Sequence, residues 1–327
     1  MGPVVCSTSN PNWERLPSHL VFYYKSPPHM NRYVMSFVFQ FPRTLDRYQF
    51  AYSFPYTHSR LTAYLKQLCA LYPTILTLEV LCTSIQQRST HILTISSPSN
   101  LTATGQSIVF ITSRVHPGES PASFVCQGLI DFLVSQHPAA SSLRDRLVFK
   151  IVPMLNPDGV VLGNYRCSLL GEDLNRQWEE PSPFLHPTIY HTKSLLQVFD
   201  KDPEIRLDFY IDIHAHSTLT NGFMYGNVFK DETRFKRQLK FPKLLANRAN
   251  DFSWSKTIFD KDVVKAGTGR RCLARSLNKN TLCYTMEVSL FSYTTKSQEQ
   301  QAYTEGVYCK LGMSIALALL DYYQLEI

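Results

Sequence analysis

The chain has 327 residues, a formal net charge of +7 and 44% hydrophobic residues, which excludes a long disordered or repetitive protein and allows one large or two smaller domains. Its longest apolar runs are too short to span a bilayer, no secretory leader pattern opens the sequence, and its eight cysteines form no Cys-x-x-Cys pair, so we expect a cytosolic protein with reduced thiols. The positive charge favours an acidic partner, but no Lys/Arg cluster is dense enough to predict nucleic-acid binding, and we expect neither a nucleic-acid nor a membrane partner.

The first predicted elements are three aromatic segments at residues 19–25, 32–41 and 48–56. They alternate in polarity and are separated by turn formers, which is typical of an antiparallel β meander. Residues 1–18 are expected to be irregular. Because three strands are few for an independent domain, we predict that residues 1–56 form a short antiparallel β segment that packs on the remainder of the chain.

Residues 57–327 alternate between strand and helix patterns. Helices are predicted at residues 61–71, from 121 onward, and at 189–199, 241–252 and 305–323, and strands at 75–81, 91–96, 107–113, 147–152, 207–213, 222–225 and 281–288. This alternation predicts an α/β fold, with a mixed, mostly parallel central sheet covered by helices on both faces.

Candidate metal ligands follow two of the predicted strands. His116 and Glu119 lie in the loop after strand 107–113, and His214 and His216 end the apolar strand that begins near residue 207. Open α/β sheets bind ligands beyond the carboxyl ends of their strands, and two imidazoles with one carboxylate can hold zinc. Strand alternation points both later histidines the same way, so spacing does not choose between them. The alternative is a turn histidine and a glutamate that favours a helix N-terminus.

Other polar residues are suited to act beside such a metal. Arg166 and the pair Asn175-Arg176 fall in irregular backbone and could bind an oxyanion and a carboxylate, although each arginine alone could be a surface ion-pair residue. Asp212 could orient a histidine ligand. Glu287 interrupts an apolar strand, where a carboxylate must be paired or functional, and beside a zinc-activated water it would be a general base. The alternative is a buried ion pair with an arginine.

Five motifs stand in the order found in the zinc metallocarboxypeptidases. They are His116-Pro117-Gly118-Glu119, Asn156-Pro157-Asp158-Gly159, Asp173-Leu174-Asn175-Arg176, Asp212-Ile213-His214-Ala215-His216 and Thr285-Met286-Glu287. The second motif has strong turn chemistry, and we expect it to shape the site rather than react. The chain resembles most the cytosolic carboxypeptidase branch of that family, with residues 124–128, 162–168 and 265–271 carrying the finer match.

The resemblance implies a metallocarboxypeptidase-like fold and one zinc ion per chain. It implies His116, Glu119 and His214 as the zinc ligands, Glu287 as the general base and Arg166 as the group that stabilises the oxyanion. The implied reaction removes one carboxy-terminal amino acid at a time.

The resemblance also implies which substrate is bound. Asn175 and Arg176 would hold the terminal carboxylate, and the basic segment around residues 265–271 would choose the side chain, with Arg270 preferred because flanking glycines would give it room to turn inward. Cytosolic carboxypeptidases trim glutamates from polyglutamylated proteins, so the expected partners are acidic carboxy-terminal tails, those of tubulin included. The expected location is the cytosol, in association with microtubule structures.

The sequence departs from the wider family in two places. No tyrosine lies between Tyr225 and Tyr284, which leaves the mobile tyrosine of the digestive enzymes without a candidate, and the amino-terminal β domain is short. Two other functions are therefore weighed. One is a zinc amidohydrolase of small acyl amino acids, whose carboxylate Asn175 and Arg176 would also suit. The other is a protein that binds acidic tails without hydrolysing them.

Overall fold

The computed structural model describes residues 2–326 of the chain. The chain separates into two compact units, Met1–Pro55 and Tyr56–Ile327. No helix within the described residues is long and apolar enough to cross a membrane.

The first unit consists of two small antiparallel sheets. β1 (Val4–Ser7) lies between β2 (Glu14–Arg15) and β5 (Tyr48–Ala51). β3 (Val21–Ser26) and β4 (Arg32–Phe37) form a separate hairpin. The unit is therefore antiparallel β, as predicted, but its strands are not paired as predicted.

The predicted meander is wrong because β5 pairs with β1 and not with β4. The connection between β4 and β5 includes Pro42 and is too long for a tight hairpin, so β5 is free to find another partner. β1 has only four residues. Such a short strand gives too little alternation for sequence periodicity to detect, which explains why residues 1–18 were expected to be irregular.

The second unit is built on an eight-stranded mixed sheet with the strand order β12-β11-β13-β10-β8-β9-β7-β6. The four central strands β13, β10, β8 and β9 are mutually parallel. At one edge β7 runs antiparallel to both β9 and β6, and at the other β11 runs antiparallel to β13 and parallel to β12. The strands are β6 (Leu76–Thr83), β7 (Ser89–Ile95), β8 (Gln106–Ser113), β9 (Leu147–Val152), β10 (Ile205–His216), β11 (Gly222–Asn227), β12 (Ile258–Asp260) and β13 (Leu282–Ser289), with the hairpin β14 (Ser292–Thr294) and β15 (Gln300–Ala302) outside the sheet.

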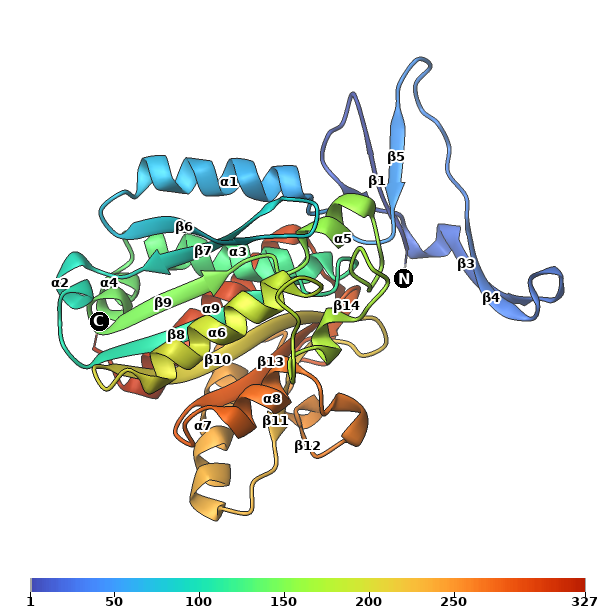
Figure 1. The fold of residues 1–327 in the computed structure, drawn as a ribbon. Coiled ribbons are helices and arrows are strands. Elements are labelled where there is room, and N and C mark those ends of the chain that lie inside the picture. The colour runs from blue at the N-terminus through green and yellow to red at the C-terminus, as the bar shows by residue number, and fades with distance from the viewer. Residues whose placement is uncertain (1, 327) are drawn as a thin grey trace. The chain divides into compact units, whose positions relative to one another are not determined.

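Helices cover both faces of this sheet, with α3 and α9 on one side and α6 and α8 on the other (Figure 1). The helices are α1 (His58–Leu71), α2 (Pro98–Leu101), α3 (Ser120–Val134), α4 (Pro138–Arg146), α5 (Pro157–Leu162), α6 (Pro187–Lys201), α7 (Glu232–Arg248), α8 (Gly269–Ser276) and α9 (Glu305–Tyr323). The predicted α/β fold class is thus confirmed.

Glycines allow α3 and α9 to pack very closely. A Cβ atom on Gly128 would lie 2.1 Å from the carbonyl oxygen of Cys309, and one on Gly312 would lie 2.0 Å from that of Val125. Any side chain at either position would force the helices apart. This close contact fixes α3, which follows the loop that carries His116 and Glu119.

The Asn-Pro-Asp-Gly motif begins a helix instead of forming the predicted turn. The Asn156 side chain caps α5 by accepting a hydrogen bond from the Gly159 N–H at 3.0 Å, and Pro157 occupies the first helical position. Asparagine and proline at these positions also favour helix initiation, so the same residues fit both structures. Asp158 is buried and accepts hydrogen bonds from Ser84, Gln86 and Arg88, which secures α5 to the β6–β7 connection.

Candidate active site

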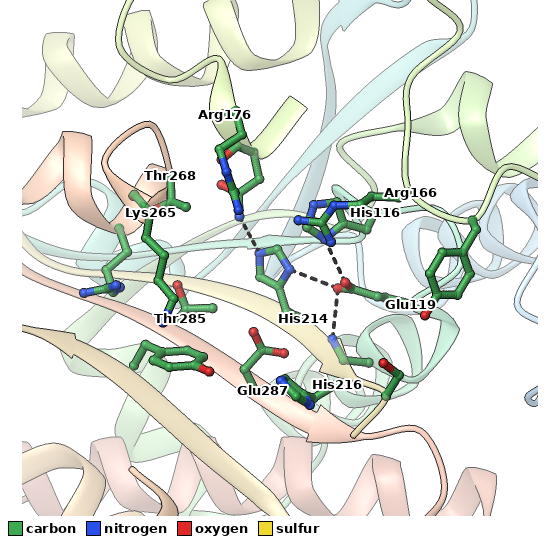
Figure 2. Close-up of a pocket in the computed structure, with 16 residues that line it drawn as sticks. His116, Glu119, Arg166, Arg176, His214, His216, Lys265, Thr268, Thr285 and Glu287 are labelled. Carbon is green, nitrogen blue, oxygen red and sulfur yellow. Dashed lines mark hydrogen bonds and ion pairs between the residues drawn. The ribbon is translucent and has the colours of Figure 1, made fainter. Parts of the chain in front are cut away.

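A cavity of about 250 Å³ lies beyond the carboxyl ends of β8, β10 and β13 (Figure 2). It is lined by all eight residues that the sequence singled out for catalysis or binding, which are His116, Glu119, Arg166, Asn175, Arg176, His214, Arg270 and Glu287. The sheet topology accounts for their meeting, because β8, which precedes His116, and the parallel strands β10 and β13, which carry His214 and Glu287, end at one edge.

The three predicted metal ligands converge in this cavity. His116 Nδ1 lies 2.7 Å from Glu119 Oε1, and His214 Nδ1 lies 2.9 Å from Glu119 Oε2. One donor atom from each residue lies within 4.8 Å of the other two. Two imidazole nitrogens and a carboxylate, with the cavity on the open side, are the donor set of a catalytic zinc site. These residues therefore fit zinc.

Two aspartates hold the histidine rings in place. His116 Nε2 lies 2.9 Å from Asp173 Oδ1, and His214 Nε2 lies 2.7 Å from Asp212 Oδ2. A carboxylate at Nε2 keeps a proton there and leaves Nδ1 as the nitrogen that faces a metal. Asp212 was proposed for this task from the sequence, whereas Asp173 was missed, although it belongs to one of the five motifs.

The charges of these groups support one another. Burial by itself would lower the pKa of His116, but the carboxylates of Glu119 and Asp173 raise it above its ordinary value. Burial would raise the pKa of Glu119, but His116 and His214 hold it well below its usual range. In the same way His116, Arg166 and Arg176 depress the pKa of Asp173 against the effect of burial. Both carboxylates are therefore ionised at neutral pH.

His216 is separate from this donor group. Its Nδ1 accepts hydrogen bonds from the backbone N–H groups of Thr218 and Leu219, each at 3.1 Å. The nitrogen that would correspond to the ligand atom of His214 is thus used to hold the following turn. The structure resolves the choice that strand spacing left open, since His214 joins His116 and Glu119 and His216 does not.

Both predicted anion-binding arginines lie beside Asp173. Arg166 donates to Asp173 Oδ2 through Nε at 2.9 Å and approaches it through Nη2 at 2.8 Å. Arg176 Nη1 lies 3.8 Å from the same oxygen and donates to the Asn175 carbonyl at 3.0 Å. The Arg166 and Arg176 side chains are 42% and 34% exposed. A guanidinium has five N–H donors, so each retains donors for a further anion.

Asn175 is more constrained than the two arginines. Its Oδ1 accepts a hydrogen bond from the Gly269 N–H at 3.1 Å, and its Nδ2 lies 3.2 Å from His214 Nε2. Because His214 Nε2 carries its proton toward Asp212, it does not accept from this amide, whose N–H groups remain as donors for a substrate. Asn175 is nevertheless buried, whereas Arg176 is partly exposed, so the geometry places more of the predicted carboxylate binding on Arg176.

Glu287 is the acid that faces the three metal ligands without a partner. It lies on β13 directly opposite His214 in the parallel register with β10, so both side chains lie on the same face of the sheet (Figure 2). Within residues 2–326 its carboxylate makes no hydrogen bond and no ion pair. Burial raises the pKa of Glu287 to about 7, the charge of His214 lowers it and that of Glu119 raises it. An unpaired carboxylate of this kind is available for proton transfer.

The basic side of the cavity differs from the expected glycine-rich loop. Arg270 begins α8 and is 1% exposed, and its guanidinium contacts Asp260 at 3.2 Å and the Asn227 side chain at 2.9 Å. Gly269 serves close packing, because a Cβ there would lie 2.8 Å from the Tyr210 hydroxyl. It does not give the arginine room to turn. Arg270 lines the cavity, but with its donors largely used.

Lys265 is the more accessible cation on this side. Its side chain is 28% exposed, and its Nζ lies 2.8 Å from Asp260 Oδ2 and 3.9 Å from the centre of the Tyr225 ring. Asp260 also lies 3.7 Å from Arg271, so three cations share one carboxylate and the group stays positive. Sequence reasoning missed Asp260.

Sequence reasoning also missed two tyrosines that line the cavity, Tyr165 and Tyr225. Tyr225 lies within β11, the strand antiparallel to β13, and its partner in the register is Thr285. The signal that could have found Tyr225 was its position at the end of a predicted strand.

Residues 61–310 match the zinc carboxypeptidase family. Over its whole length the chain is 57% identical to human cytosolic carboxypeptidase 6, and it spans 65% of that protein. Over 99% of its length it is 43% identical to cytosolic carboxypeptidase 6 of Caenorhabditis elegans, and it spans 72% of that protein. The crystal structure of a metallo-carboxypeptidase from Burkholderia cenocepacia has the same fold, with a TM-score of 0.82 and 23% identity over 99% of this chain and 80% of that one. The chain therefore belongs to the zinc carboxypeptidase family and, within it, to the cytosolic carboxypeptidases, as its motifs predicted.

Proposed function

We propose that the protein is a zinc-dependent carboxypeptidase that removes carboxy-terminal glutamates one at a time from acidic protein tails. The observation that carries this proposal is the position of Glu287, an unpaired carboxylate that faces a cluster of two histidines and a glutamate. A metal site that served only structure would have no use for a free base at its open side.

In this proposal His116, Glu119 and His214 hold one zinc ion. Bound zinc supplies a Lewis acid for the scissile carbonyl and lowers the pKa of a water molecule. Glu287 accepts a proton from the attacking water and passes it to the leaving amine, so that the carboxylate is regenerated. Because no residue of the described chain, 2–326, forms an ion pair with Glu287, none of them has to be displaced before it accepts the proton.

Arg166 and Arg176 bind the negative charges of the reaction. Arg166 stabilises the oxyanion that develops on the scissile carbonyl, and Arg176, with the spare N–H of Asn175, binds the free carboxylate at the end of the chain. An enzyme that grips this carboxylate acts from the end of a polypeptide and not within it. Both guanidiniums are partly exposed, which lets them reach a substrate.

The cations around Asp260 favour an acidic side chain at the cleaved end. Lys265 is the group with room to contact that side chain, and Arg270 adds positive charge from behind it. A lysine or arginine at the end of the substrate would be repelled. Relatives named cytosolic carboxypeptidases and the net charge of +7 support a cytosolic protein acting on polyglutamylated tails, such as those of tubulin at microtubule structures.

The test is mass spectrometry of peptides that end in a run of glutamates, incubated with the protein before and after treatment with a zinc chelator. We expect stepwise loss of glutamate that stops on chelation and resumes when one equivalent of zinc is restored. A peptide that ends in lysine is the matched control and should react much more slowly. Equal release of lysine would refute the specificity, and faster hydrolysis of small acyl amino acids would favour an amidohydrolase. Tight binding of polyglutamate without turnover in zinc-replete buffer would favour a binding protein.

A further inference from the structure

Arg114 is a buried arginine at the base of the loop that carries His116 and Glu119. It directly follows β8, its backbone is left-handed with a φ of +58°, and it is 4% exposed. A left-handed backbone is strained in a residue other than glycine, and burial of a guanidinium is costly unless the group is hydrogen-bonded. The contacts of this side chain must offset both costs.

The guanidinium fastens the loop from within. Its Nε donates to the Pro117 carbonyl at 2.9 Å, and its Nη1 donates to the Ser123 hydroxyl at 2.8 Å. His116 and Glu119 lie in the stretch of chain that these contacts enclose. One side chain thus ties the start of the loop to its middle and to the first turn of α3.

A second contact holds the same loop from outside. The Gly118 N–H donates to the Tyr165 carbonyl at 2.8 Å, and a Cβ atom on Gly118 would lie only 2.6 Å from that oxygen. The backbone between the two ligands is therefore held between the Arg114 guanidinium and the segment at Tyr165. Loss of either contact would free the loop on one side.

The charge of Arg114 has no carboxylate directly against it. Within residues 2–326 no acid lies within the 4.0 Å of an ion pair, and Glu119 is the acid whose charge acts most strongly on the guanidinium. The guanidinium therefore depends on its hydrogen bonds to the loop, and not on an ion pair, to offset the cost of its burial.

Glu119 needs this support more than the two histidines do. His116 and His214 are each oriented by an aspartate at Nε2. Among the described residues, the Glu119 carboxylate has one further hydrogen-bond partner besides the histidines, the backbone N–H of Ala215, at 3.0 Å from Oε2. Its position therefore depends on the shape of its own loop.

We propose that Arg114 is a positioning residue of the metal site, which shapes the loop so that His116 and Glu119 are presented together. This inference rests on the proposed zinc site. Arg114 does not line the cavity, so its effect on zinc passes through the loop and not through a contact with metal or substrate.

The experiment is a zinc titration of the full chain after chelator treatment, with affinity measured by competition against a chromogenic chelator. We expect Arg114→Met to weaken zinc binding about 10- to 100-fold, the range for groups that orient metal ligands. Arg114→Gly removes the backbone strain as well and should weaken binding equally. Arg114→Lys keeps a charge and one donor and should recover part of the loss. The visible spectrum of the cobalt-substituted protein should change with Arg114→Met, because it reports ligand geometry.

Arg144→Met is the matched control. Arg144 is also a buried arginine whose Nη1 donates to backbone carbonyls, Ser135 among them at 3.0 Å, but it lies on α4 outside the cavity. The Arg144→Met substitution should lower the unfolding temperature and leave zinc affinity within twofold of the unsubstituted protein.

The inference would be overturned if Arg114→Met bound zinc with an affinity within twofold of the unsubstituted protein. It would also be overturned if Arg144→Met lost as much zinc affinity as Arg114→Met. Should Arg114→Met fail to fold, Ser123→Ala decides, since it removes only one partner of the guanidinium. A severalfold loss of zinc affinity in Ser123→Ala supports the inference, and an unchanged affinity refutes it. An unsubstituted chain that binds no zinc would refute the zinc site itself, a result distinct from a zinc-binding chain that does not respond to Arg114.

Discussion

The metal side and the substrate side of the cavity are built differently. His116 and His214 are each 3% exposed, and each is oriented by a buried or half-buried aspartate. On the substrate side Arg166, Arg176 and Lys265 are between 28% and 42% exposed and keep unused donors. The ligands are thus fixed before a metal or substrate arrives, whereas the cations have freedom to rearrange.

This difference indicates how the two sides should respond to substitution. A preorganised metal site loses affinity or catalytic rate when a support is removed, because nothing else can take its place. A mobile cation that contacts the substrate equally in the ground state and the transition state mainly changes KM. Glu287 lies between the two sides and has no support of its own, so its chemistry can be separated from binding on either side.

The largest effect is expected for Glu287→Gln. Glutamine keeps the shape of the side chain but cannot accept the proton of the attacking water, so kcat should fall about 10³-fold. Bound zinc should remain at one per chain, since Glu287 is not among the three grouped donors. Steady-state kinetics on a glutamate-ended peptide, with zinc measured by atomic absorption, checks both statements.

The control for this variant is Glu79→Gln, an exposed glutamate on β6 that should leave kcat unchanged. A Glu287→Gln protein with full activity would show that another group takes the proton. Loss of zinc together with activity would instead place Glu287 on the metal side of the comparison.

The next largest effect is expected for Arg176→Met. A hydrogen bond to a charged group contributes about 1.5–3 kcal/mol, so loss of the carboxylate contact should raise KM about 10- to 100-fold with a smaller change in kcat. Peptides with an amidated terminus lack the carboxylate and should not distinguish the variant from the unsubstituted protein. A fall in kcat at unchanged KM would show that Arg176 acts in the transition state, as Arg166 is proposed to do.

The fold of the second unit could be predicted because its strands are long and apolar. β9 and α9 have the predicted limits, and β8, β10 and β13 differ only at their ends. The predicted residues met in the cavity because parallel strands that end together bring His116, His214 and Glu287 to one edge. The first unit could not be predicted in the same way, because its shortest strands have two and four residues.

Contacts between particular side chains could not be predicted from the sequence. Whether Arg270 turned inward depended on Asp260, which belongs to a three-residue strand that periodicity does not detect. The contact between His116 and Asp173 depended on the backbone conformation of the irregular segment that contains Asp173. Such contacts join distant positions of the chain, and a pattern of neighbouring residues carries no information on them.

A smaller effect is expected for Lys265→Met, which tests the selectivity of the substrate side. A partly exposed ion pair contributes up to about 1 kcal/mol, so the preference for glutamate over glutamine at the cleaved end should fall about fivefold. Competition between two peptides that differ only in this residue measures the ratio directly. Lys261→Met, an exposed lysine outside the cavity, should leave the ratio unchanged. An unchanged ratio in Lys265→Met itself would assign the selectivity to Arg270.

The smallest effect is expected for Asp251, in the pH dependence of stability. Unlike Asp173, this buried acid is not surrounded by cations. Asp251 is buried and accepts a hydrogen bond from the Tyr303 hydroxyl at 2.9 Å, and within residues 2–326 it has no ion pair. Burial raises its pKa to about 6, against the lowering effect of that hydrogen bond. The folded protein therefore holds the proton to a higher pH than the unfolded chain, whose aspartates have a pKa of about 3.9.

The sign of the pH dependence follows from this difference. Between about pH 4 and pH 7 the folded state binds more protons at Asp251 than the unfolded chain does, so this group lowers the stability of the fold as the pH rises. Above about pH 7 Asp251 is ionised in both states and the loss is complete. The asparagine of Asp251→Asn cannot ionise, so the variant does not lose stability in this way as the pH rises. From pH 5 to pH 7.5 the free energy of unfolding of the variant should therefore rise by about 1 kcal/mol relative to the unsubstituted protein. Urea unfolding at both pH values measures this difference, and any constant cost of the amide cancels. If the difference in free energy of unfolding between the two proteins does not change with pH, Asp251 is ionised in the folded protein at both pH values. In that case one tyrosine hydroxyl stabilises a buried carboxylate as well as the cations around Asp173 do.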